Sequence, residues 1–205
     1  CLPNLLLFQV HLAHLTKNIK LGTGAHLLPY HHPVELAHRV AYLDHLAQGR
    51  YMFGIGSGGL MSDQELFNVD MEAGEHREMT REALDIILKV WENQGPSHYK
   101  GKFWNFNIPD PKDYEYGASF GPLGKVFITP FQKPHPPIGV AAASPGSETL
   151  KIAGERGYIP MSLGLNAVYV ASHWDAVEEG AKRVNREPPS RSQWRIGRAS
   201  CRERV

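Results

Sequence analysis

The run from Lys20 to Gly59 constrains the fold of this chain more than any other segment. It contains two apolar stretches, 19–28 and 51–55, whose continuous hydrophobicity predicts strands buried on both faces, as parallel strands are. Between them, Pro33 suits the first position of a helix, apolar residues follow at helical spacing, and Gly49 can end the helix. This strand–helix–strand order predicts parallel pairing, and ligands of such folds bind in the loops that follow the strands.

The same alternation continues along the chain. The spacing of apolar residues predicts helices over 5–15, 75–92, 144–153 and 167–184, and strands over 138–143 and 158–163. The segment 95–137 interrupts it with glycine, proline and aromatic residues. It predicts an irregular excursion with a hairpin around Lys100 and Gly101, which either caps a site or varies freely. We therefore expect an α/β fold on a parallel sheet, either open or closed into a barrel.

Composition limits the possible functions. The 205 residues are 42% hydrophobic and 21% charged, which is typical of a globular chain, and no stretch is apolar enough to predict a membrane span. The net charge is +1, so there is no basic excess that would indicate a nucleic acid partner. The only cysteines are Cys1 and Cys201, which favours a reducing compartment and hence the cytoplasm.

The last ten residues have an unusual sequence, IGRASCRERV. This string is what one frame of a common short-read sequencing adapter encodes. We expect residues 196–205 to be such an artefact and residues 1–195 to belong to one domain. These ten residues carry three arginines and one glutamate, so without them the net charge falls from +1 to −1.

The segment from Gly54 to Gly59 matches the spacing G-x-G-x-x-G after a predicted strand. Residues from Leu60 onward do not open directly into an apolar-periodic helix, and no acidic strand end follows about 20 positions later, which disfavours a dinucleotide fingerprint. A glycine turn without a ligand remains open, as does a loop whose amides approach another anion. Ser57 is no hydrolase nucleophile elbow, because Ile55 stands where that motif needs glycine.

Histidine and serine residues supply the other candidates. The 11 histidines include no H-E-x-x-H pattern and no Cys/His set, so we expect no metal site. Taken alone, His31 is better explained as a loop or capping residue than as an active-site group. The segment Ser144–Ser147 places two hydroxyls and free backbone N–H groups at a predicted helix start, which suits either an anion site or a plain N-cap.

Several motifs in this order resemble the bacterial luciferase-like family of flavin-dependent monooxygenases. The likeness begins with Gly22-Thr-Gly24-Ala25 and Leu43-Asp-His-Leu46, and it extends to about Trp194. Shorter motifs resemble the limonene monooxygenase-type branch, namely Tyr30-His-His-Pro33, Ser62-Asp63 and Ser144-Pro145.

The resemblance implies a (β/α)8 barrel that uses reduced FMN and O2 to oxygenate a small organic substrate, often with a separate flavin reductase. It places Gly24 and Ala25 under the isoalloxazine ring, where the family often has a cis peptide. It assigns the phosphate to Ser144, Pro145, Gly146 and Ser147, the flavin edge to Gly56 and Ser57, and a supporting role to Arg77. His31 or His32 would stabilise or protonate the activated oxygen or the substrate. Luciferases proper have Cys and Arg where this chain has Gly56 and Ser57, so light emission is not supported.

The resemblance also implies that this chain is truncated at both ends. The family's first two β–α units precede the Gly24–Ala25 strand, and its last two follow the end of this chain, so we expect about the third to the sixth strand. The loop that carries the catalytic histidine of luciferases proper lies in the missing part. We expect the isolated fragment to be unstable and inactive, because its sheet has open edges, and the full-length protein to be a homo-oligomer. An F420-dependent oxidoreductase and a non-catalytic flavin-binding relative remain as alternatives.

Overall fold

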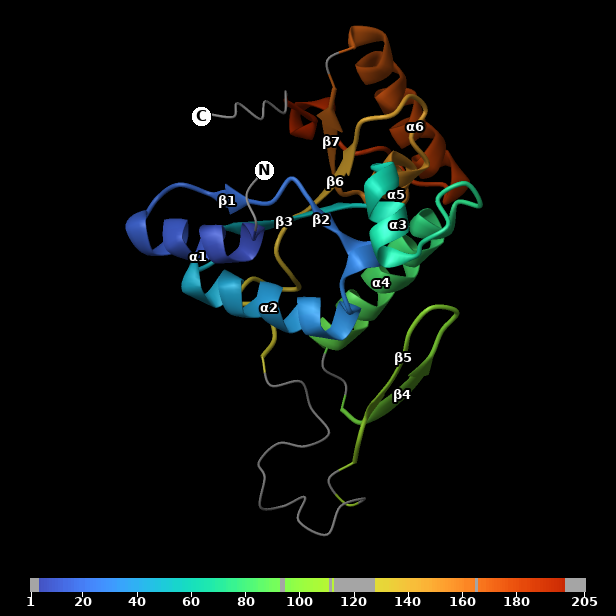
Figure 1. The fold of residues 1–205 in the computed structure, drawn as a ribbon. Coiled ribbons are helices and arrows are strands. Elements are labelled where there is room, and N and C mark those ends of the chain that lie inside the picture. Colours follow the sequence, from blue (N-terminus) through green and yellow to red (C-terminus); the bar gives the residue numbers. More distant parts are fainter. Residues whose placement is uncertain (1–3, 93–94, 111, 113–127, 165, 198–205) are drawn as a thin grey trace.

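The computed structural model describes residues 4–92, 95–110, 112, 128–164 and 166–197. Parallel strands form a curled sheet in the order β1-β3-β6-β7-β8, with β2 also paired to β3, and helices cover its outer side (Figure 1).

The helices are α1 (Leu5–Leu15), α2 (Pro33–Leu46), α3 (Met61–Phe67), α4 (Glu75–Glu92), α5 (Glu148–Arg156) and α6 (Ala167–Arg183). The strands of the sheet are β1 (Leu21–Gly22), β2 (His26–Leu27), β3 (Tyr51–Gly56), β6 (Ile138–Ala142), β7 (Ile159–Leu163) and β8 (Arg195–Gly197). Within the described residues, short 3₁₀ helices span Leu28–Tyr30 and Arg191–Gln193.

Most predicted elements are confirmed within a residue or two, and the sheet is parallel as predicted. Two elements were not predicted. Helix α3 follows the glycine loop. Its sequence has no apolar periodicity that would predict a helix, because none of its residues is buried. Strand β8 has only three residues, all exposed, and it falls partly within the suspected artefact. Residues 198–205 lie outside the described part, so the origin of that segment stays a prediction.

The predicted strand 19–28 is interrupted by a bulge. Gly22 pairs with Met52 and His26 pairs with Ile55, so residues 23–25 face only two residues of β3. The Gly54 amide donates to Thr23 Oγ1 (3.2 Å), and this hydroxyl donates to the Gly54 carbonyl (3.1 Å). The Thr23 side chain thus takes over hydrogen bonds that a regular ladder would make. The sequence could not reveal the bulge, because the extra residue is visible only once the two strands are paired.

Helix α5 begins later than predicted. Its first residue is Glu148, and Ser147 rather than Ser144 is the N-cap residue. Gly146 has a φ of +56°, in the left-handed region that glycine favours, so the chain turns before the helix starts. Ser144 therefore belongs to a loop between β6 and α5.

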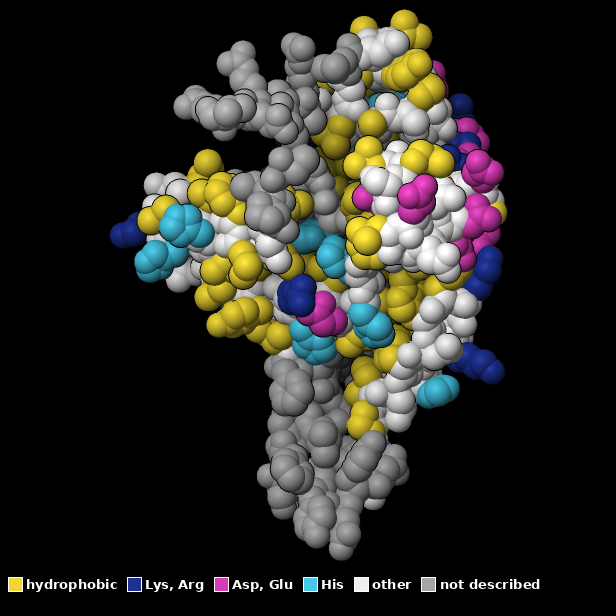
Figure 2. Space-filling view, viewed as in Figure 1, with side chains coloured by type: hydrophobic (Ala, Val, Ile, Leu, Met, Phe, Trp, Pro, Cys, Tyr) yellow, Lys and Arg dark blue, Asp and Glu magenta, His cyan; other side chains and the backbone are white. Residues whose placement is uncertain are grey.

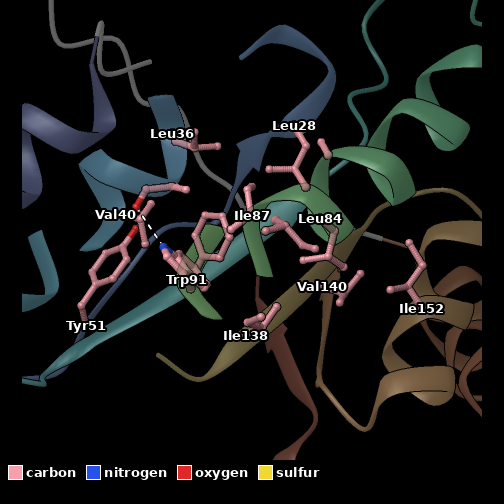
Figure 3. Packing of buried hydrophobic residues seen from close by; sticks show 14 of the residues in the cluster. Leu28, Leu36, Val40, Tyr51, Leu84, Ile87, Trp91, Ile138, Val140 and Ile152 are labelled. Carbon is pink, nitrogen blue, oxygen red and sulfur yellow. Dashed lines mark hydrogen bonds between the residues drawn. The ribbon is translucent and has the colours of Figure 1, made fainter. Parts of the chain in front are cut away.

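The core lies between the outer side of the sheet and the helices (Figure 3). Phe53 packs edge-on against Trp91 of α4, with ring centroids 5.6 Å apart. The Trp91 indole N–H donates to the Ala37 carbonyl of α2 (3.0 Å), which satisfies its one polar atom. These contacts join β3, α2 and α4, and they fix where the carboxyl ends of the strands lie.

The predicted hairpin is present as β4 (Ser97–Lys100) and β5 (Asn105–Ile108). It is attached to α4 through Glu82, whose carboxylate accepts hydrogen bonds from the amides of Lys102, Phe103 and Trp104 at 3.2–3.3 Å. Residues 113–127 of the excursion lie outside the described part. Among the described helices, none is both long and apolar enough to cross a bilayer.

Candidate cofactor and active site

A cavity of about 390 Å³ lies at the carboxyl ends of β2, β3, β6 and β7. It is lined by most of the residues that the sequence proposed for the cofactor: Gly24, Ala25, Gly56, Ser57, Arg77, Ser144 and Ser147. The other two, Pro145 and Gly146, lie in the same loop without lining the cavity. Residues far apart in sequence are therefore brought together where parallel folds bind ligands.

One wall of this cavity is bare backbone. A Cβ atom on Gly24 would meet no atom within 4 Å, so Gly24 faces open space. The peptide between Gly24 and Ala25 is cis, as the family resemblance implied. Gly56, Ala141 and Ala142 add further small residues. A flat ring can approach such a wall closely, because no side chain projects from it.

Other lining residues carry hydrogen-bonding groups. Ser57 and Thr149 are 7% and 5% exposed, and their hydroxyl oxygens lie 2.8 Å apart, which ties the loop after β3 to the first turn of α5. Ser147 makes no side-chain hydrogen bond to the helix it caps. The first amides of a helix have no partner within it, so this helix start can receive an anion. Thr149 was missed from sequence, because the predicted helix began at Ser144 and left Thr149 beyond its first turn, whereas α5 begins at Glu148.

Arg77 is the cation of this cavity. It has no ion-pair partner among the described residues, whereas the nearby Arg81 pairs with Glu155 and Arg156 pairs with Asp85. Figure 2 shows acidic and basic side chains gathered along one edge of the molecule. Arg77 is thus available to an external anion.

The two predicted catalytic histidines do not line this cavity. His31 lines a second cavity of about 310 Å³, which shares Ala25, Leu27 and Asp63 with the first. His32 lies with Trp104 on a third one, of about 330 Å³, that His31 also reaches. Histidine side chains gather near the middle of the face in Figure 2. The structure therefore puts His31 beside the candidate cofactor cavity and His32 farther out.

His26 also lines the second cavity and was missed, because it lies inside the predicted strand. Its Nε2 is 3.1 Å from the Tyr51 hydroxyl, which lies 3.2 Å from Thr23 Oγ1. Burial, with His31 nearby, lowers the pKa of His26 to about 3. Burial and Arg39 also lower the pKa of His31. Both imidazoles are therefore neutral at neutral pH.

Among the described residues, no group of three His, Cys, Asp or Glu side chains could hold a metal ion.

Known proteins share this architecture. Limonene 1,2-monooxygenase from Rhodococcus erythropolis is 32% identical over 194 residues, covering 93% of this chain and 44% of the relative. The oxygenating constituent of 3,6-diketocamphane monooxygenase from Pseudomonas putida, solved in complex with FMN, has a TM-score of 0.78 and 30% identity, covering 95% of this chain and 52% of that one. The coenzyme F420 dependent tetrahydromethanopterin reductase from Methanopyrus kandleri has a TM-score of 0.69, covering 97% of this chain and 54% of that one, but at 22% identity it supports the fold alone.

The chain spans about half the length of the curated relatives that it matches. The described sheet is accordingly a half-barrel of the type that these relatives contain. The sequence profile of the luciferase-like monooxygenase family matches residues 4–202. The chain therefore belongs to the luciferase-like monooxygenase family.

Proposed function

We propose that the full-length protein is a flavin-dependent monooxygenase that transfers one oxygen atom of O2 to a small organic substrate. The observation that carries this proposal is the first cavity, which joins a bare backbone wall to an end rich in hydrogen-bond donors. FMN has the matching shape, a flat ring linked to a phosphate. When bound, reduced FMN supplies the two electrons with which one oxygen atom enters the substrate and the other leaves as water.

The residues present fit this cofactor. The open space over Gly24 accommodates the ring, and Ala25 and Gly56 keep the wall flat. Arg77 and the start of α5 hold the phosphate, with Ser144 and Ser147 as hydroxyl donors and with Pro145 and Gly146 shaping the loop. The hydroxyl pair of Ser57 and Thr149 keeps the two loops at a fixed separation.

The second cavity supplies a place for the substrate. It shares Ala25 and Leu27 with the first, and its wall includes Leu6 and Phe67, which suits a mainly apolar molecule. Because His31 is neutral, one of its ring nitrogens can donate a proton to the substrate while the other accepts one. His32 lines the third cavity and not the second.

The finer features of the whole protein belong to the same proposal. Residues 1–195 form part of one barrel domain, with the described strands at about the third to the sixth position. A separate reductase delivers reduced FMN, and the complete chain assembles as a homo-oligomer in the cytoplasm. Another similar protein, from Acinetobacter baylyi and 33% identical over 150 residues, is the oxygenase component of a flavin-dependent trigonelline monooxygenase, which supports a two-component system.

Cofactor titration of the full-length protein tests the proposal. We expect FMN to bind and F420 not to bind. Gly24→Val should weaken FMN binding by about 100-fold, because two methyl groups would occupy the space that the ring needs. With chemically reduced FMN and O2, limonene or a camphane diketone should give an oxygenated product and lower the yield of H2O2, which forms when no substrate takes the oxygen atom.

Two results would contradict the proposal in different ways. Binding of F420 without FMN would establish the hydride-transfer alternative. FMN binding without any oxygenated product from a panel of monocyclic and bicyclic terpenes would support a non-catalytic flavin-binding relative.

A further inference from the structure

His76 is a buried polar side chain without a partner in the wall of the first cavity. It lies in the first turn of α4 and is 4% exposed. Its Nδ1 is buried and unpaired, and neither ring nitrogen makes a hydrogen bond with the described residues. Nδ1 has almost no accessible surface, so a ligand in the cavity can reach only Nε2, and Nε2 is the nitrogen left to bond with it.

The surroundings of His76 show which part of a ligand would lie there. Its chain neighbours Gly74 and Arg77 face Glu148 and Thr149 across a cleft of about 270 Å³, so this end of α4 lies against the first turn of α5. The Ser147 side chain does not cap that turn, and the Arg77 guanidinium has no ion-pair partner in the described residues. His76 is therefore at the anion-binding end of the cavity.

The protonation state of His76 is suited to a donor role. Burial, together with Arg77, lowers the pKa of His76, so the ring is neutral at neutral pH. A neutral imidazole has one N–H donor and one acceptor nitrogen. It can therefore donate to a phosphate oxygen without adding a second buried charge beside Arg77.

We propose that His76 binds the phosphate of FMN, donating a hydrogen bond from its imidazole N–H next to Arg77. This inference rests on the proposed function and adds a residue that neither the glycine motifs nor the serine loop indicated. Riboflavin has the same ring and no phosphate, so it separates a phosphate contact from a ring contact.

The test compares FMN and riboflavin binding to the full-length protein and to His76→Ala. Loss of one hydrogen bond to a charged group should weaken FMN binding by about 10-fold and leave riboflavin binding unchanged. His76→Gln keeps an N–H donor and should recover part of the FMN affinity. His98→Ala, at an exposed position of β4, is the matched control and should change neither affinity.

Equal weakening of both flavins by His76→Ala would overturn the proposal, because it would indicate a ring contact or a structural role. Unchanged FMN binding in a folded variant would overturn it as well. If His76→Ala does not fold, His76→Gln decides: selective loss of FMN affinity relative to wild type with intact riboflavin affinity supports the proposal, and no selectivity refutes it. Failure of the wild-type protein to bind either flavin would instead refute the proposed function itself.

Discussion

Gly24 and Gly54 lie on paired segments of the same sheet, yet their surroundings are opposite. A Cβ on Gly54 would lie 1.6 Å from the Thr23 carbonyl oxygen, whereas a Cβ on Gly24 would meet nothing within 4 Å. Gly54 is glycine because the bulged strand occupies the space above it. Gly24 keeps a space open at the rim of the sheet, where the cavity lies. The region around Gly54 is therefore closely packed, whereas the region around Gly24 leaves space for a ligand.

Gly54→Ala should have the largest effect on stability. The added methyl group collides with backbone that cannot rotate away, so we expect unfolding of the full-length protein to become easier by about 3 kcal/mol or more. Denaturant melts of the ligand-free protein measure it. Gly59→Ala is the matched control, since a Cβ there also meets nothing within 4 Å, and it should change stability by less than about 0.5 kcal/mol.

Gly24→Val provides the converse test of the comparison. It should leave the ligand-free melting curve close to that of wild type while abolishing tight FMN binding, as proposed above. Equal destabilisation by the changes at Gly24 and Gly54 would show that the rim is packed like the rest of the sheet, and the distinction would fail.

The network behind the bulge should make stability depend on pH. His26 has a pKa of about 3 when folded and an ordinary value of 6.5, so the unfolded chain binds its proton first as the pH falls. Stability is therefore complete above about pH 6.5 and is lost toward pH 3. The His26 contribution should be about 2 kcal/mol between pH 7 and pH 5.

His31 and His76 have lowered pKa values and act in the same direction. Denaturant melts at pH 7 and pH 5 give the change in unfolding free energy for wild type and for His26→Phe. The difference between these two changes is the contribution of His26. Gly59→Ala, which removes no titrating group, serves as the control and should keep the wild-type slope. A wild-type slope in His26→Phe would mean that His26 is not the titrating group.

The smallest effect is expected for the hydroxyl pair that joins the two loops of the cavity. Thr149→Val leaves the buried Ser57 hydroxyl unpaired and should cost about 1 kcal/mol of stability, whereas Thr149→Ser should cost less because it keeps the hydroxyl. The double variant with Ser57→Ala should be less destabilised than the sum of the single changes. Strict additivity would show that the two hydroxyls do not interact.

The sequence predicted much of this architecture because its elements have strong local signals. Helix α4 carries a broad apolar face, and β3 and β6 are continuously apolar, so each could be placed within a residue or two. Helix α3 escaped prediction because it buries no residue, and the start of α5 was misplaced because the turn at Gly146 could not be distinguished from a first helical turn.

The candidate site was predictable only in part. Family-like motifs indicated the glycines, Ser57, Arg77 and the serine loop, and the structure gathers most of them around one cavity. His26, His76 and Thr149 were not indicated, because each belongs to a regular element where a polar residue has no distinctive local pattern. Their significance depends on burial and on partners that are distant in sequence.

The sequence by itself determined the order of strands and helices, the parallel sheet and the membership of a family, because these follow from periodicity and from motifs that are local. Only the tertiary structure decided which glycine supports packing and which opens a cavity, where His31 lies relative to that cavity, and which buried side chain has no partner. The physical reason is that space and hydrogen-bond satisfaction are properties of pairs of segments. They come into existence only when distant parts of the chain meet.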